Sequence, residues 1–122
     1  MGLRDKRFVG SEGEELVARF LMGENINILA RNYHTSDSEI DIIFEDEGYI
    51  VFGEVKMRSS YNYGIPEASV NLNKQKHICK ASRVFLYSNH YPLDVLVRYD
   101  VFAISNGTVN WIKNAFEYCL RY

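Results

Sequence analysis

The chain has 122 residues, of which 47% are hydrophobic and 25% charged, so it can bury a core and is not intrinsically disordered. It lacks the apolar core of a signal peptide and the roughly 20 consecutive apolar residues that span a bilayer, and two cysteines are too few for a disulfide framework. We therefore expect one domain over residues 1–122, located in the cytoplasm and without a membrane partner.

The net charge of −2 hides an uneven distribution of charged residues along the chain. Residues 1–55 carry twelve of the 16 acidic residues and five of the 14 basic ones, whereas residues 56–122 carry nine basic and four acidic residues. A folded domain with this distribution can present an acidic site beside a basic surface.

Hydrophobic periodicity predicts the order of the elements along the chain. We expect a helix over about 4–22, strands over 26–33, 38–46 and 49–57, a helix over 72–88, strands over 97–105 and 108–112, and a short helix within 114–122. A long loop separates the third strand from the second helix. This order predicts a mixed α/β domain with helices flanking a central sheet.

The second and third strands form a predicted hairpin around the two-residue turn at 47–48. Counting back from this turn places Asp41 opposite Glu54 and Glu39 opposite Lys56. Because side chains alternate along a strand, these four charged residues share one face. The other face carries apolar residues, namely Ile40, Ile42 and Phe44.

The facing carboxylates of Asp41 and Glu54 are the candidate functional groups of this hairpin. Like charges directly opposite each other destabilise a sheet, so a cation should compensate them. Mg²⁺ suits such a site because it prefers hard oxygen ligands, with Mn²⁺ as an alternative, and Lys56 would lie beside the bound water. The alternative is a solvated face with an ordinary cross-strand ion pair, but Asp41 lies inside an apolar run that is expected to be buried.

The first helix contributes a third acidic residue, Glu14, which shares the predicted inward face with Val17 and Leu21. Gly10 and Gly13 beside it would let the helix approach another backbone closely. The alternative for Glu14 is an exposed acid in the first turn, where the helix dipole favours negative charge.

An ordered set of residues over nearly the whole chain resembles the YraN-like family of small bacterial proteins. The set comprises Gly10, Gly13, Glu14, Ala18, Arg31, Asn32, EIDII at 39–43, VFGEVK at 51–56, Arg58, Gly64, Lys74, Gln75, Ala81, Tyr99, Asp100, Asn114, Ala115 and Phe116. Members of this family are predicted nucleases similar to archaeal Holliday-junction resolvases of the PD-(D/E)xK superfamily. Ser38, Gly53 and His34 depart from the family pattern.

The resemblance implies a restriction-endonuclease-like core with a mixed central sheet. It further implies that Asp41 and Glu54 are metal ligands, that Lys56 is the catalytic lysine and that Glu14 is an accessory acid. We expect the main-chain carbonyl of Val55 to complete the metal site.

A basic stripe on the second helix is the predicted DNA-binding surface, since no acidic residue lies between Glu67 and Asp94. Its residues are Lys76, Lys80 and Arg83, with Arg58 in the preceding loop. On the same helix, Gln75 either reaches the site as an accessory residue or serves in packing or helix capping.

These observations predict a Mg²⁺-dependent endonuclease that cleaves DNA, with branched or structured DNA as a candidate substrate. One alternative is a DNA-binding or recombination-associated module that keeps the fold without cleaving, because fold alone does not establish activity. Another is a self-associating interaction module. The sequence leaves the oligomeric state open, with a homodimer among the alternatives.

Overall fold

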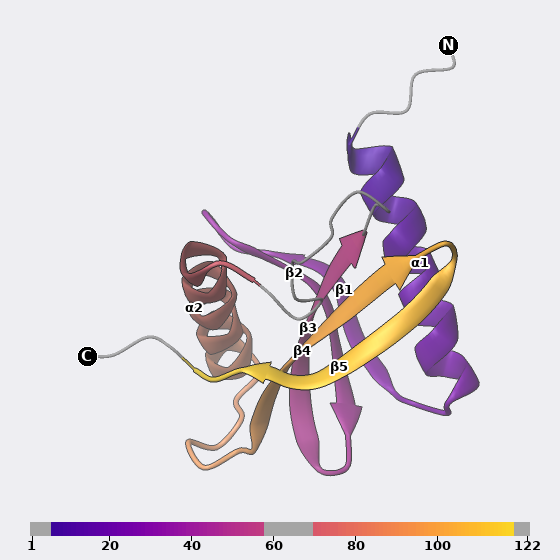
Figure 1. Ribbon diagram of the computed structural model, residues 1–122. Coiled ribbons are helices and arrows are strands. Elements are labelled where there is room, and N and C mark those ends of the chain that lie inside the picture. The colour runs from indigo at the N-terminus through magenta and orange to yellow at the C-terminus, as the bar shows by residue number, and fades with distance from the viewer. Residues whose placement is uncertain (1–5, 58–69, 119–122) are drawn as a thin grey trace.

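The computed structural model describes residues 6–57 and 70–118 of the chain. A five-stranded sheet forms the middle layer, with α1 on one face and α2 on the other (Figure 1). The elements are α1 (Lys6–Gly23), β1 (Ile28–His34), β2 (Glu39–Asp46), β3 (Tyr49–Met57), α2 (Leu72–Ser88), β4 (Val97–Ser105) and β5 (Thr108–Phe116).

The strands lie in the sheet in the same order as in the chain, β1-β2-β3-β4-β5. All neighbouring pairs are antiparallel except β3 and β4, which run parallel because α2 carries the chain back between them. The sheet is therefore mixed, and the α/β fold is consistent with a restriction-endonuclease-like core, as expected.

Two hydrophobic clusters fill the spaces between the sheet and its helices. The cluster under α1 contains Val17 and Leu21 of the helix together with Phe44 and Phe102 of the sheet. The cluster under α2 includes Phe52, Ile78, Phe85 and Tyr99. Because both faces are covered, the central strands are apolar on both sides, which explains the unbroken apolar run in β2.

The two-residue turns of both hairpins occur where the sequence indicated them. Glu47 and Gly48 have φ values of 53° and 84°, and Asn106 and Gly107 have φ values of 51° and 76°. Positive φ at both turn residues matches the right-handed twist of the flanking strands. The first turn pairs Asp46 with Tyr49 and so sets the expected register of β2 and β3.

The expected alternation of side chains along β2 is wrong at one point. Ile40 packs in the cluster under α2, whereas Ile42 and Phe44 pack under α1, so these three residues do not share a face. The break lies at Asp41, beside the point of β1 where Asn32 adopts a left-handed backbone conformation with φ 52°.

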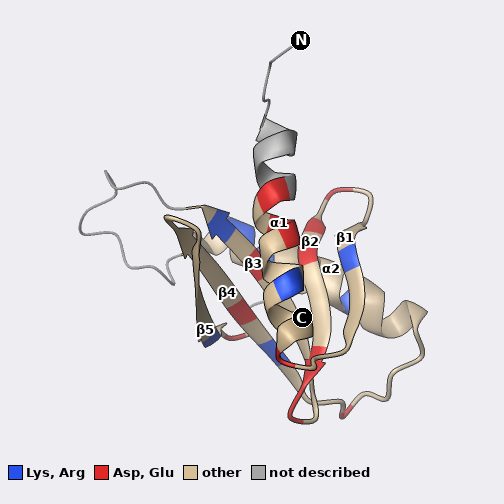
Figure 2. Ribbon diagram, turned by 90° about the vertical axis from the view of Figure 1, so that its right-hand side faces the viewer, with Lys and Arg blue, Asp and Glu red and all other residues tan. Residues whose placement is uncertain are grey.

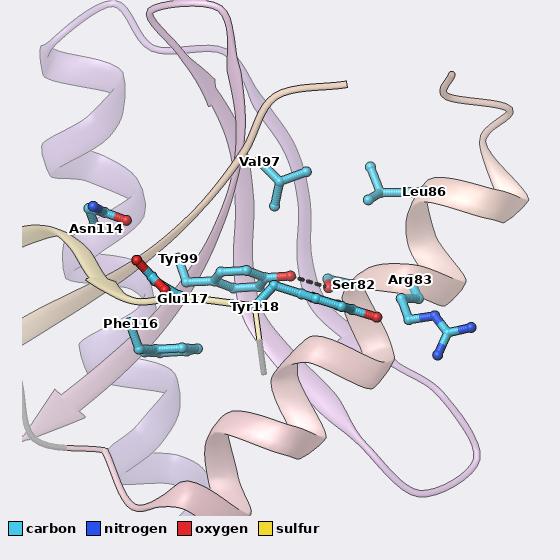
Figure 3. Close-up of a pocket in the computed structure, with 9 residues that line it drawn as sticks. All are labelled: Ser82, Arg83, Leu86, Val97, Tyr99, Asn114, Phe116, Glu117 and Tyr118. Atoms are coloured by element: carbon cyan, nitrogen blue, oxygen red, sulfur yellow. Dashed lines mark hydrogen bonds between the residues drawn. The ribbon is translucent and has the colours of Figure 1, made fainter. Parts of the chain in front are cut away.

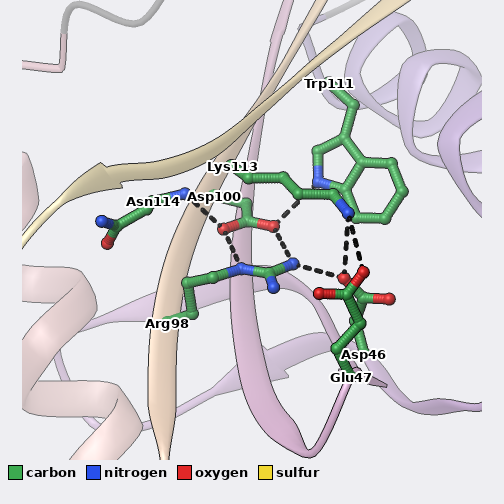
Figure 4. A network of polar contacts seen from close by, with 7 residues as sticks. All are labelled: Asp46, Glu47, Arg98, Asp100, Trp111, Lys113 and Asn114. Carbon is green, nitrogen blue, oxygen red and sulfur yellow. Dashed lines mark hydrogen bonds and ion pairs between the residues drawn. The ribbon is translucent and has the colours of Figure 1, made fainter.

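A buried carboxylate holds the end of β5 against β4 (Figure 4). Asp100 is fully buried and accepts hydrogen bonds from Arg98 at 2.9 and 2.8 Å, from Trp111 Nε1 at 2.8 Å and from the main-chain N–H of Asn114 at 2.9 Å. Arg98 also donates to Asp46 at 2.7 Å. Arg98 and Asp100 form an ion pair at 2.8 Å, and four hydrogen bonds satisfy the buried charge of Asp100.

The expected C-terminal helix is wrong at its start, because Asn114–Phe116 continue β5. The pairing shifts between Tyr99 and Val101, so residues 113–115 bulge opposite Asp100. The main-chain N–H that this bulge leaves without a ladder partner is the one that Asp100 accepts. Residues 119–122 lie outside the described residues.

Candidate metal and nucleic-acid site

Three carboxyl groups from three elements meet at one end of the sheet. Asp41 of β2 lies within hydrogen-bond reach of Glu14 of α1 on one side and of Glu54 of β3 on the other. Figure 2 shows acidic residues on α1, β2 and β3 in this part of the molecule. The hairpin register predicted the pair of Asp41 and Glu54 from the sequence, and the fold brings Glu14 to this pair.

The pKa values of the outer two carboxyl groups are strongly raised. Burial, followed by the charge of Asp41, raises the pKa of Glu54 to about 8, although nearby Lys74 opposes the rise. Burial, again followed by the charge of Asp41, raises the pKa of Glu14 to about 7. The crowding of negative charge that the hairpin register predicted is therefore present, and it disfavours full ionisation of the cluster.

The end of the strand ladder positions Asp41. The pairing of β2 with β3 runs from the turn to Ile42 and Gly53, and one further step in this register places Asp41 opposite Glu54. At this point the Asp41 side chain, instead of a main-chain carbonyl, is the hydrogen-bond acceptor. Its Oδ2 accepts the main-chain N–H of Val55 at 2.8 Å. This hydrogen bond fixes the carboxylate at the point where the strands separate.

Glycine at position 13 lets α1 lie close to β3. An added Cβ there would be 2.9 Å from the sulfur of Met57 and 3.4 Å from a methyl group of Val55. This confirms the expected close approach at Gly13. The sequence pattern predicts that Glu54 and Lys56 lie near the inner face of the first helix. Because Val55 and Met57 face α1, however, strand alternation places Glu54 and Lys56 on the face toward α2.

Two polar neighbours of the acidic cluster were not assigned to it from the sequence. Lys74 at the start of α2 places its Nζ 3.8 Å from Glu54 Oε2. Asn32 of β1 hydrogen-bonds Glu14 through its side chain and lowers the pKa of that group. The sequence signal at position 32 is the residue type itself, because asparagine tolerates the left-handed backbone conformation found there better than most residues do.

The donor set of the cluster fits a hard divalent cation. Asp41 and Glu54 offer adjacent carboxylate oxygens, and removing their mutual repulsion is the contribution that a bound Mg²⁺ would make. Within residues 6–57 and 70–118 no three His, Cys, Asp or Glu side chains are arranged around a common ion position. The candidate site therefore rests on two carboxylates, with the Val55 carbonyl as the expected third ligand.

The basic stripe of α2 differs from the expectation of free positive charge. Lys80 Nζ lies 2.6 Å from Asp37 Oδ2, so an acidic residue that is distant in sequence forms an ion pair with one lysine of the stripe. Lys76 and Arg83 are exposed on the same helix. Arg58 lies outside the described residues. Gln75 donates to the carbonyl of Val70 at 2.7 Å, whereas the N-cap of α2 is Asn71, whose side chain accepts the main-chain N–H of Lys74 at 2.8 Å.

Two of the cavities that border α2 differ in how they lie relative to the acidic cluster. A polar cavity of about 430 Å³ adjoins the acidic cluster and is lined by residues 34–39 with Lys74 and His77. The other, of about 370 Å³, lies between α2 and the ends of β4 and β5 (Figure 3). In it the hydroxyl groups of Tyr99 and Ser82 are 2.8 Å apart, and burial raises the pKa of Tyr99. None of the three clustered carboxyl groups lines this second cavity.

Comparison with known sequences identifies the family. The profile described as "Uncharacterised protein family UPF0102" matches residues 13–104. The chain belongs to the UPF0102 family. The UPF0102 protein of Saccharophagus degradans is 39% identical over 107 residues, covering 88% of this chain and 91% of the relative. The UPF0102 protein of Lachnoclostridium phytofermentans is 35% identical over 113 residues, covering 93% and 96%.

Membership of UPF0102 confirms the YraN-like resemblance seen in the sequence. The matched span contains Glu14, Asp41, Glu54 and Lys56, so the whole acidic cluster lies in the part of the chain that UPF0102 defines. In the described part of this UPF0102 protein, no helix combines the length and apolar character needed to cross a membrane.

Proposed function

We propose that this UPF0102 protein is a Mg²⁺-dependent DNA endonuclease that acts in the cytoplasm. The observation that carries the proposal is the Asp41 carboxylate, fixed by the Val55 N–H and placed between Glu14 and Glu54. Clustered carboxyl groups with raised pKa values are characteristic of functional sites, because folding alone gains nothing from such repulsion. The preference for branched or structured DNA rests on the family resemblance.

In this proposal Asp41, Glu54 and the Val55 carbonyl hold the cation. A bound Mg²⁺ supplies a water of lowered pKa and polarises the phosphodiester. Mn²⁺ has similar ligand preferences and can replace it.

The remaining residues of the cluster position the reactants. Lys56 follows Glu54 by two residues on the same strand face, where its ammonium group can hold the attacking water or a phosphate oxygen. Glu14 contacts Asp41 and fixes its orientation. The DNA strand approaches from the α2 side, where Lys76 and Arg83 are exposed.

The test is cleavage of linear, branched and single-stranded DNA by the purified protein with Mg²⁺, Mn²⁺ or EDTA. We expect metal-dependent cleavage by the wild type and none by Asp41→Asn or Glu54→Gln. Glu45→Gln makes the same kind of change at an exposed residue of β2 and should retain cleavage. Full activity in either of the first two variants would refute the assigned metal site.

The alternative of an inactive DNA-binding module predicts a different result in the same experiment. The wild type would then retard DNA on a gel without cleaving any of the substrates in either metal. Titration with Mn²⁺ in the absence of DNA separates the two functions further, since only the nuclease needs the cation.

A further inference from the structure

The polar cavity beside the acidic cluster contains a cation that the proposed mechanism does not use. Its volume of about 430 Å³ lies within the range of small-ligand sites, roughly 300–1,000 Å³. One wall is the turn between β1 and β2 and the other is the first part of α2, where Lys74 and His77 share a face at a spacing of three residues. A contact of 3.2 Å between Ser38 Oγ and His77 Nδ1 joins the walls.

The acidic residues of this cavity already have close basic partners. Asp37 lies 2.6 Å from Lys80, and Glu39 lies 3.3 Å from the ring of His34. Lys74 has the longest of these contacts, 3.8 Å from Glu54. Lys74, the one lysine among the residues that line the cavity, is therefore held less tightly by its acidic partner than Lys80 is by Asp37.

Lys74 and Glu54 also differ in their freedom to move. The Glu54 side chain is 13% exposed on a central strand, whereas the Lys74 side chain is 38% exposed on a flexible stem. A divalent cation bound by Glu54 would repel the ammonium group of Lys74. Displaced in this way, Lys74 would extend into the adjoining cavity, with the hydroxyl groups of Thr35 and Ser36 on its other wall.

We propose that Lys74 is an exchangeable cation, which neutralises Glu54 while no metal is bound and binds a backbone phosphate of DNA in the polar cavity once a divalent cation occupies Glu54. This inference rests on the proposed function and assigns a further positioning residue to the same site. It couples metal binding to DNA binding, because the group that leaves the metal ligand becomes the contact for the phosphate.

The first experiment measures Mn²⁺ affinity by calorimetry without DNA, at pH 9, where the carboxyl groups are ionised. We expect Lys74→Met to bind Mn²⁺ about three- to tenfold more tightly than the wild type, because the repelling charge is gone. Lys74→Arg should resemble the wild type. Arg19→Met removes one charge from the exposed surface of α1 and should leave Mn²⁺ affinity unchanged.

The second experiment measures binding of a short DNA duplex in a Lys56→Ala background, which prevents cleavage, with EDTA or saturating Mn²⁺. We expect Lys74→Met to change affinity little in EDTA but to lower it about tenfold with Mn²⁺. The slope of log affinity against log salt concentration should also decrease in magnitude by about one with Mn²⁺, and should not change in EDTA. His77→Gln should weaken DNA binding in Mn²⁺ without changing Mn²⁺ affinity.

Two results would overturn the exchange while leaving the nuclease proposal intact. One is an unchanged or weaker Mn²⁺ affinity in Lys74→Met, and the other is an equal loss of DNA affinity in EDTA and in Mn²⁺. A wild-type protein that binds no Mn²⁺ would overturn both proposals, so the two failures are distinguishable.

Discussion

Replacement of Glu54 by glutamine tests the crowding of charge in the acidic cluster through the stability of the metal-free protein. In the folded chain burial and Asp41 raise the pKa of Glu54 from 4.5 to about 8. Stability due to this group is therefore complete below about pH 4.5 and is lost as the pH rises through about 8. Glutamine stays neutral, and its amide can donate to Asp41 as a protonated carboxyl group would.

The shift sets the size of the effect. One pKa unit corresponds to about 1.4 kcal/mol, so the full shift of Glu54 corresponds to about 5 kcal/mol, of which about 4 kcal/mol is lost between pH 5 and pH 9. We expect about 3 kcal/mol, because the raised pKa of Glu14 lets that group carry a proton in the same range and so relieve part of the repulsion. The pKa of Glu14, raised to about 7, also lies in this range and contributes to the pH dependence of both proteins, whereas the pKa values of Glu15, Asp37 and Asp46 are lowered and these groups titrate below it.

The assay is urea unfolding in EDTA at pH 5 and pH 9. The wild type should lose stability on going to pH 9, and Glu54→Gln should lose markedly less and be the more stable protein there. Glu24→Gln, an exposed change just after α1, should follow the wild type. Equal pH dependence in the wild type and Glu54→Gln would refute the reasoning, because the charge of Glu54 would then cost nothing.

Three further predictions concern packing, the buried ion pair and DNA. A Cβ at Gly53 would lie 2.9 Å from Ile42 and 3.0 Å from Phe102, so Gly53→Val should destabilise the fold by about 1–3 kcal/mol in urea unfolding; unchanged stability would contradict the packing. Asp100→Asn leaves Arg98, only 8% exposed, without its main partner, and should cost about 3–5 kcal/mol in the same assay. Lys76→Glu should lower the salt slope of DNA binding by about one, and Lys80→Glu by less because Asp37 already neutralises it; equal slopes would argue against that pairing.

Local sequence determined most of the secondary structure. The second helix runs over Leu72–Ser88 as its apolar spacing predicted, and both two-residue turns lie where Glu47–Gly48 and Asn106–Gly107 indicated. Such features depend on near neighbours in the chain, through helical periodicity and the positive φ that these turns require. The apposition of Asp41 with Glu54 belongs to this class, since a short turn sets the register of its hairpin.

Contacts between distant segments were decided by the tertiary structure. Periodicity placed Glu14 on the inward face of α1, but only the packing of that helix brought it to Asp41. The approach of Lys74 to Glu54 likewise depends on how α2 packs against the sheet.

The same distinction explains the errors of the sequence analysis. Asp37 and Lys80 are 43 residues apart, so no local pattern shows that one neutralises the other. The apolar residues of Asn114–Phe116 fit a helix equally well by themselves, but the buried carboxylate of Asp100 accepts the N–H of Asn114 and retains this segment in β5. Tertiary contacts override the helix propensity of a short segment where its main chain must hydrogen-bond a buried charge. Leaving that charge without hydrogen bonds costs more free energy than a short helix gains.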